Sequence, residues 1–81
     1  MSTMTRRELL QELQTRRIPE EAYCLDGGLP CEAYVLGFGE GQWQVYYSER
    51  GQKTGCRDFA TESEACVCFL ERISREVKPR P

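Results

Sequence analysis

Five cysteines are the residues of this 81-residue chain with the most evident capacity for chemistry. They are Cys24, Cys31, Cys56, Cys66 and Cys68. An odd count, no C-x-x-C pair and no export signal ahead of them are atypical of a disulfide framework. We therefore expect reduced thiols that pack as small apolar residues.

A zinc site is the more specific alternative for these cysteines, because four thiolates can form a structural site. The chain has no histidine, however, and its one close pair, Cys66 and Cys68, falls in a segment predicted to be helical. Side chains two positions apart on a helix point roughly 200° away from each other. We expect no metal and no cofactor.

The sequence also offers few residues for a catalytic site. Without histidine there is neither a Ser-His-Asp triad nor a Cys-His pair. The glycines Gly37, Gly39 and Gly41 form G-x-G-x-G, but in a predicted strand and turn rather than ahead of a helix, where a phosphate loop needs them. Asp26 and Glu32 could converge as a carboxylate pair, as exposed acids do by chance. We expect a protein that is not an enzyme.

Charge is unevenly distributed along the chain, although the net charge is only −2. Residues 1–19 carry four bases and two acids, residues 50–81 carry seven bases and five acids, and no lysine or arginine lies between Arg17 and Arg50. The acids of this middle segment are Glu20, Glu21, Asp26, Glu32, Glu40 and Glu49. They are either a solubilising rim around exposed strands or a surface for a basic partner.

The composition is that of a small globular domain, with 40% apolar and 30% charged residues. No apolar run approaches the roughly 20 residues of a membrane span. The N-terminal MSTMTRRELLQEL is charged where a signal peptide would be apolar. We expect one cytoplasmic domain over residues 1–81, with an ordered core at about 5–77 and a flexible tail at 78–81.

Capping boxes predict a helix at each end of the chain. Thr5 with Glu8, and Thr61 with Glu64, match the pattern in which both side chains satisfy first-turn amides. Pro19 limits the first helix to about residue 17. Between the helices, apolar residues alternate with period two, which predicts strands at 33–38 and 42–47.

Strand register follows from placing apolar residues opposite each other. For the first two strands this predicts the pairs Tyr34 with Tyr47, Leu36 with Val45 and Phe38 with Trp43, joined through a loop at residues 39–42. A tight turn at residues 49–50 then predicts Tyr47 opposite Gln52.

The repeat EAY-x-Leu, at residues 21–25 and 32–36, predicts one more hairpin, with Tyr23 opposite Tyr34. An irregular lead-in at residues 21–25 is the alternative. The predicted fold class is α+β: a helix, a three- to four-stranded antiparallel meander and a helix, with both helices on one face of the sheet.

In this register the loop at 26–31 and the turn at 48–51 share one end of the sheet. Asp26, Glu32 and Glu49 would converge there, with Gln44 and Tyr46 beside them on the helix-free face. An exposed aromatic ring with a polar tip is a plausible hot spot. These five residues are the predicted partner-binding site. The alternative is that Tyr46 only covers the sheet and the acids only solubilise it.

The order of elements resembles the double-stranded-RNA-binding domain. Such domains hold RNA phosphates with lysines at the start of the second helix. Here that position reads Thr61-Glu62-Ser63-Glu64, and the hairpin belongs to the acidic segment. The resemblance covers topology and no functional residue. A nucleic-acid-binding or regulatory domain remains the alternative function, although nucleic acid is not the partner we expect.

A second resemblance fits the charge better. The runs YYSERG at 46–51, KTG at 53–55 and FATE-x-EAC at 59–66 are similar to small bacterial immunity proteins of polymorphic-toxin loci. The resemblance spans about residues 7–73. It implies an intracellular single-domain inhibitor, monomeric when free, that occludes a cognate toxin domain. An acidic inhibitor suits toxins with basic clefts.

Overall fold

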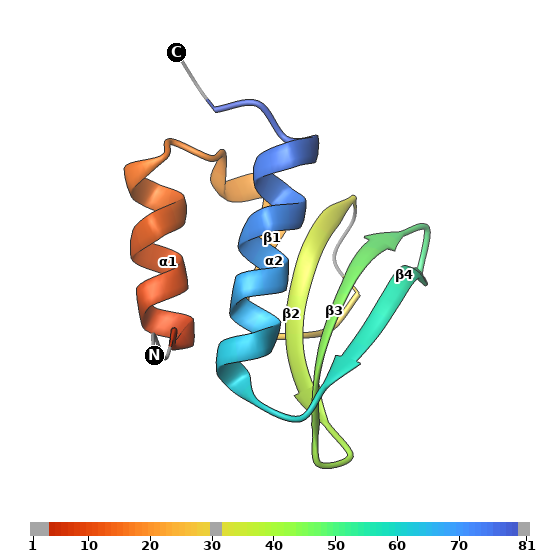
Figure 1. Ribbon diagram of the computed structural model, residues 1–81. Helices are drawn as coiled ribbons and strands as arrows, with labels where there is room; N and C mark the ends of the chain where they lie inside the picture. Colours follow the sequence, from red (N-terminus) through yellow and green to blue (C-terminus); the bar gives the residue numbers. More distant parts are fainter. Residues whose placement is uncertain (1–3, 30–31, 80–81) are drawn as a thin grey trace.

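The computed structural model describes residues 4–29 and 32–79, in which four strands form one sheet with two helices on one side (Figure 1). The helical elements are α1 (Arg6–Thr15), the short 3-10 turn η1 (Glu20–Ala22) and α2 (Glu62–Glu76). The strands are β1 (Tyr23–Cys24), β2 (Ala33–Gly39), β3 (Gln42–Glu49) and β4 (Gln52–Phe59), and they lie in this order across the sheet. The predicted α+β class is confirmed.

Both helices begin at the predicted caps. The hydroxyl oxygen of Thr5 accepts from the amide of Glu8, and that of Thr61 accepts from the amide of Glu64, each at 3.2 Å. The two helices run parallel to each other, with both N-termini at the lower end in Figure 1. Within the described residues, no helix is long and apolar enough to cross a membrane.

One apolar core joins the helices to the sheet. α2 packs across β2, β3 and β4, and α1 packs against α2. The fully buried members of this core are Leu9, Leu13, Leu36, Val45, Ala65, Cys66, Phe69 and Ile73. The helix stripes and the strand alternation expected from the sequence therefore meet as predicted.

The register between β2 and β3 is the predicted one. Tyr34 pairs with Tyr47, Leu36 with Val45, and Phe38 with Trp43. The connection is tighter than the expected loop, because Glu40 and Gly41 alone form the turn, with φ of 54° and 77°. Two successive positive φ values suit the right-handed twist of the flanking strands.

The predicted register between β3 and β4 was wrong. The turn is formed by Arg50 and Gly51, with φ of 51° and 76°, and Tyr47 therefore pairs with Thr54 rather than Gln52. An X-Gly pair accommodates this left-handed turn, whereas a turn at residues 49–50 would place no glycine in it. A β-bulge near Gly55 shifts the register again, so that Trp43 lies opposite Phe59.

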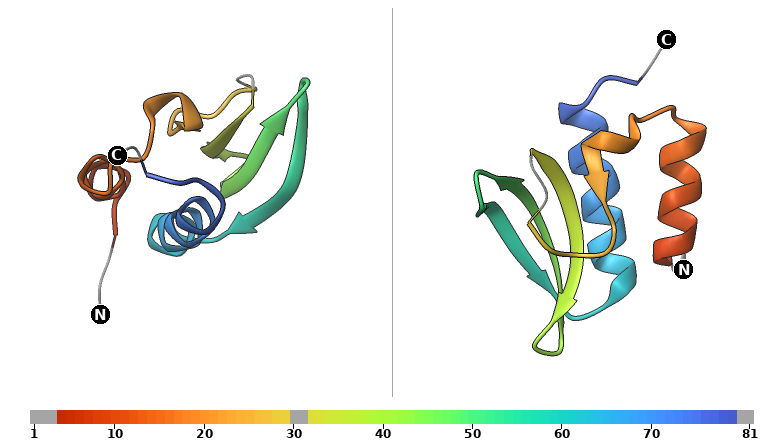
Figure 2. Two further views of the ribbon diagram at one scale, coloured as in Figure 1. Left: turned by 90° about the horizontal axis from the view of Figure 1, so that it is seen from above. Right: turned by 180° about the vertical axis from the view of Figure 1, so that it is seen from behind.

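β1 was predicted with the correct partner and the wrong direction. Tyr23 does pair with Tyr34, but β1 runs parallel to β2. The chain must therefore return to the start of β2, and residues 25–29 cross β2 on the side away from α2 (Figure 2, right). This crossing lies close to the sheet: the amide of Gly27 donates to the carbonyl of Leu36 at 3.1 Å.

The returning segment covers the face that was expected to be open. Val35, Tyr46 and Ser48 alternate with the core residues of β2 and β3, yet they are at most 2% exposed. The Tyr46 hydroxyl donates to the carbonyl of Gly28 at 2.6 Å. A Cβ on Gly37 would lie only 3.2 Å from the Cα of Gly27, so the two backbones approach closely. This face is free of helices, as predicted, but the expectation that it would be open was wrong.

Candidate partner-binding site

Two of the five predicted site residues lie together at one end of the sheet. Ala33 pairs with Ser48 where β2 begins and β3 ends, and Glu32 and Glu49 flank this pair. Glu32 is exposed and Glu49 is half-buried. Their carboxylates are thus placed at the same end by the β2–β3 register, as the sequence predicted.

Asp26 lies elsewhere, so the predicted convergence of three acids was wrong. Its neighbour Gly27 is hydrogen-bonded to Leu36, partway along β2. The Asp26 carboxylate pairs instead with the guanidinium of Arg6, at the start of α1, over 3.4 Å. The parallel direction of β1 is the reason, because it carries the chain away from the Glu32 end before the loop returns.

Gln44 and Tyr46 do not form an accessible surface beside the acids. The Gln44 side chain accepts from the ammonium of Lys53 at 3.2 Å, partway along β3. Tyr46 is 2% exposed and holds the crossing segment through Gly28. The Lys53 ammonium also lies 4.7 Å from the centre of its ring. Tyr46 thus supports the loop and was wrongly expected to be exposed.

The same parallel direction brings two further acids to the Glu32 end. β1 and β2 start at the same end, and η1 immediately precedes β1. Its residues Glu20 and Glu21 are exposed there, and η1 contacts β1 and β2. We define the acidic end as Glu20, Glu21, Glu32 and Glu49. An antiparallel β1 would have sent Glu20 and Glu21 to the opposite end, which is why sequence reasoning missed them.

A row of tyrosines lies just inside the acidic end. Tyr23, Tyr34 and Tyr47 are neighbours across three strands, on the side that faces the helices. All three are half-buried, and the ring centroids of Tyr34 and Tyr47 lie 4.8 Å apart. No sequence pattern singled out this row, because the residues appeared as ordinary core positions.

Burial and neighbouring carboxylates raise the pKa of two of these phenols above the ordinary 10.0. Burial, followed by the charge of Glu20, raises the pKa of Tyr23. Burial, followed by the charge of Glu76, raises the pKa of Tyr34. The acidic end therefore combines hydrogen-bond acceptors with aromatic O–H groups, which is a combination suited to binding a basic protein surface.

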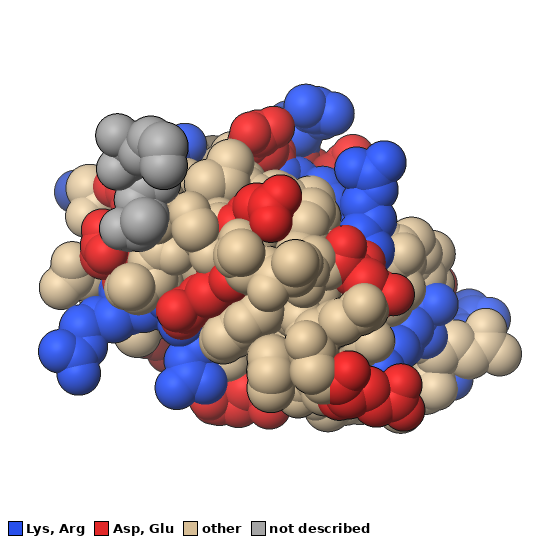
Figure 3. Space-filling view, turned by 60° about the horizontal axis from the view of Figure 1, so that its bottom comes forward, with Lys and Arg blue, Asp and Glu red and all other residues tan. Residues whose placement is uncertain are grey.

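The opposite end of the molecule also carries acids, among them Glu40 in the β2–β3 turn and Glu62 at the start of α2. Figure 3, in which this end is turned forward, shows basic and acidic side chains separated by uncharged ones. The six acids of the middle segment are therefore not one continuous surface. Four of them gather at the acidic end, whereas Glu40 lies in the β2–β3 turn and Asp26 beside α1.

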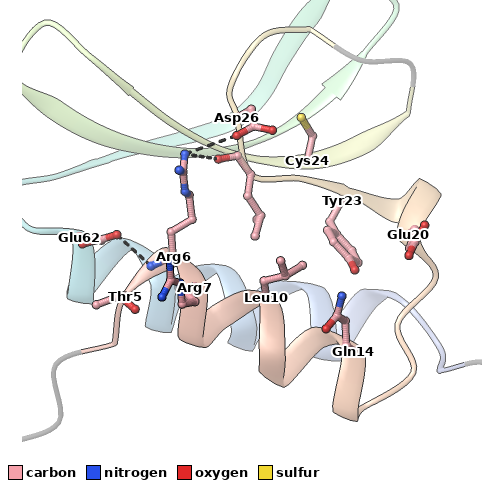
Figure 4. A pocket seen from close by; sticks show the side chains of 11 residues that line it. Thr5, Arg6, Arg7, Leu10, Gln14, Glu20, Tyr23, Cys24, Asp26 and Glu62 are labelled. Carbon is pink, nitrogen blue, oxygen red and sulfur yellow. Dashed lines mark hydrogen bonds and ion pairs between the residues drawn. The ribbon is translucent and has the colours of Figure 1, made fainter.

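A groove of about 960 Å³ lies between α1 and β1 (Figure 4). Leu10 and Tyr23 point into it, Arg6 reaches Asp26 on one side, and Glu20 lies on the other. Glu20 therefore belongs both to this groove and to the acidic end. No sequence pattern indicated the groove, because the groove depends on the parallel placement of β1.

The cysteines are spread over the structure. Cys24, Cys56, Cys66 and Cys68 are free thiols, and Cys31 is outside the described residues. Within residues 4–29 and 32–79, no three Cys, Asp or Glu side chains gather as a possible metal site. Burial, followed by the charges of Glu62 and Glu8, raises the pKa of the Cys66 thiol to about 11, which makes this thiol a poor nucleophile.

No protein-family model matches this chain, and no curated protein or solved structure is significantly similar to it.

Proposed function

We propose that this protein is an immunity-type inhibitor that binds a basic surface of a bacterial toxin domain through its acidic end and neutralises the toxin sterically. The observation that carries the proposal is the gathering of Glu20, Glu21, Glu32 and Glu49 from three separate segments beside the tyrosine row. In this proposal the protein acts in the cytoplasm, as a monomer before it binds.

The chemistry of the acidic end favours a protein partner. Carboxylates attract a basic surface over a long range and accelerate association, while aromatic residues dominate the energy of the bound state. Tyr34 and Tyr47 are held against each other by the β2–β3 pairing, so little side-chain freedom is lost on binding. The short runs within residues 46–66 that resemble immunity proteins favour the same class of partner.

Nucleic acid is a poorer partner for this arrangement. In the double-stranded-RNA-binding topology, the start of the second helix contacts phosphates, and here it carries Glu62 and Glu64. The β2–β3 turn carries Glu40. Phosphate binding requires cations at such positions. The shared order of elements therefore supports a common architecture more than a common ligand.

The test is co-expression with the toxin domain encoded in the neighbouring reading frame. The proposal predicts that the protein restores growth and that the two purified proteins form a 1:1 complex by calorimetry. Duplex RNA in a gel-shift assay should give no complex at physiological salt. Binding to the RNA without binding to the toxin domain would overturn the proposal in favour of the nucleic-acid alternative.

A further inference from the structure

The groove between α1 and β1 has an apolar middle that is only partly covered. Leu10 is 36% exposed, although it lies on a helix whose other leucines, Leu9 and Leu13, are fully buried. Tyr23 and Leu25 form the facing wall and are half-buried. The groove volume, about 960 Å³, is at the upper end of the roughly 300–1,000 Å³ typical of ligand sites.

Two backbone groups at and just after β1 already have hydrogen-bond partners, which limits how the groove can bind. The amide of Tyr23 donates to the carbonyl of Glu20. The carbonyl of Leu25 accepts from the guanidinium of Arg6 at 3.3 Å. A partner strand therefore finds these two backbone groups engaged. We therefore assign recognition in the groove to side chains rather than to extension of the sheet.

The two ends of the groove differ in their charged side chains, and the first end holds the carboxylates of Asp26 and Glu62 as well as two arginines. Arg6 and Arg7 line one end, where Arg6 is held by Asp26 and Arg7 is exposed with no ion pair among the described residues. Gln14 and the exposed Glu20 line the other end. Arg7 and Gln14 are seven residues apart on α1, a separation of about 10 Å at 1.5 Å per residue.

From this geometry we propose that the groove binds a short extended segment of a partner protein, with an acidic residue toward Arg7, apolar residues over Leu10 and a basic residue toward Glu20. Four extended residues span about 10 Å, which matches the separation of Arg7 and Gln14 along the groove. The inference rests on the proposed function in one respect: the segment belongs to the same basic partner, because Glu20 is shared with the acidic end.

The test uses synthetic tetrapeptides and the free protein, so it does not depend on the toxin domain. Acetyl-Asp-Leu-Leu-Lys-amide should shift the backbone amide resonances of Leu10, Gln14 and Cys24. Acetyl-Asp-Ser-Ser-Lys-amide, which keeps the charges and lacks the apolar side chains, should bind at least tenfold more weakly. Equal binding of the two peptides, or no shift at millimolar peptide, would overturn the groove proposal and leave the toxin assay unaffected.

Two variants locate the binding in the groove. Leu10→Lys should weaken binding of the first peptide at least tenfold, whereas Val67→Lys should change it less than twofold. Val67 is the matched control because it is 38% exposed, on α2 and outside this groove. Equal loss in both variants would place the site elsewhere.

Charge exchange at Glu20 tests the direction of the segment. Glu20→Lys should weaken binding of acetyl-Asp-Leu-Leu-Lys-amide and restore it for acetyl-Asp-Leu-Leu-Glu-amide, because only a direct pair is rescued by reversing both charges. A loss of affinity for both peptides would contradict the assigned contact.

Discussion

The backbone amide of Arg6 donates a hydrogen bond to the carboxylate of Glu62 over 2.8 Å, from the first turn of α1 to the first turn of α2. A second bond, from the amide of Met4 to the hydroxyl of Ser63 at 3.2 Å, joins the same two segments. Because the helices are parallel, the positive ends of their dipoles are adjacent, and a carboxylate between them offsets the repulsion.

Glu62→Ala should therefore destabilise the fold by about 1 kcal/mol, since it removes both a charge-assisted bond and a favourable charge at two helix N-termini. Glu62→Gln should destabilise the fold about half as much as Glu62→Ala does. Urea denaturation gives the comparison. Glu71→Ala, in the exposed middle of α2, is the control and should be nearly neutral. Equal losses in both alanine variants would show that the contact contributes nothing specific.

Tyr46→Phe should destabilise the fold by about 1 kcal/mol and leave partner binding unchanged. The substitution removes the bond from the hydroxyl to the Gly28 carbonyl at 2.6 Å, beneath the segment that crosses β2. Tyr34→Phe is the matched control, because the ring of Tyr34 is half-buried and its hydroxyl makes no corresponding hydrogen bond within residues 4–29 and 32–79. If Tyr46→Phe weakens binding without affecting the melting temperature, the residue belongs to the interface after all.

Gly55→Ala should destabilise the fold by about 2 kcal/mol. Gly55 has φ of +62°, which L side chains disfavour by roughly 1–2 kcal/mol. A Cβ there would lie 2.7 Å from Arg72 Nη2, and the same guanidinium donates to the Gly55 carbonyl at 2.8 Å. Thermal unfolding measures the loss. Gly39→Ala is the control, because its Cβ would meet no atom within 4 Å.

A double variant separates the two causes at this bulge. An Arg72→Ala background removes the steric conflict. In it, Gly55→Ala should lower the free energy of unfolding only by the cost of the backbone conformation. An unchanged loss would show that the Arg72 contact is irrelevant to the requirement for glycine.

Stability should fall as pH rises above about 8.5. The pKa of Cys66 is raised to about 11, above the roughly 8.5 of a thiol in an unfolded chain. Below pH 8.5 both states bind this proton, whereas at higher pH only the unfolded thiol ionises, so the contribution is lost as pH approaches 11. The expected loss by pH 10 is on the order of 2 kcal/mol in urea denaturation.

Alanine variants assign this loss to one thiol. Cys66→Ala should flatten the decline between pH 8 and 10, although it lowers stability at neutral pH by opening a small cavity. Cys68→Ala, two positions away and half-buried, should keep the decline. A decline that persists in Cys66→Ala would have to come from other groups.

The elements that the sequence predicted correctly are those determined by local pattern. Caps at Thr5 and Thr61 define where the helices begin, and alternation of apolar residues determines the β2–β3 register. Both signals depend on neighbours in sequence or on one short turn. The β3–β4 register was predicted wrongly because a turn at residues 49–50 was chosen, although the preference of a tight turn for glycine favours Arg50-Gly51.

The direction of β1 could not be read from the repeat that suggested it. Pairing Tyr23 with Tyr34 satisfies either direction, because the side chains share a face in both. The direction of β1 depends on the end of the sheet at which α1 and η1 place the start of this strand, which is a property of the tertiary structure. Most errors in the predicted site follow from this one choice. Asp26 lies beside Arg6 rather than at the acidic end, Glu20 lies at the acidic end although it was not predicted there, and the returning loop buries Tyr46.

Glu49→Lys should slow association with the toxin domain about tenfold at low salt and weaken the salt dependence of that rate, because the acidic end steers a basic partner. Glu40→Lys is the matched control: it changes the net charge equally, but it lies in the β2–β3 turn at the opposite end of the strands. At 0.1 M salt its association rate should stay within about twofold of the parent and should change less than that of Glu49→Lys, since charges farther apart than a Debye length of about 10 Å are largely screened there. Stopped-flow measurements at several salt concentrations distinguish the two variants. If both slow association equally, net charge rather than the acidic end governs the encounter, and the assigned site is wrong.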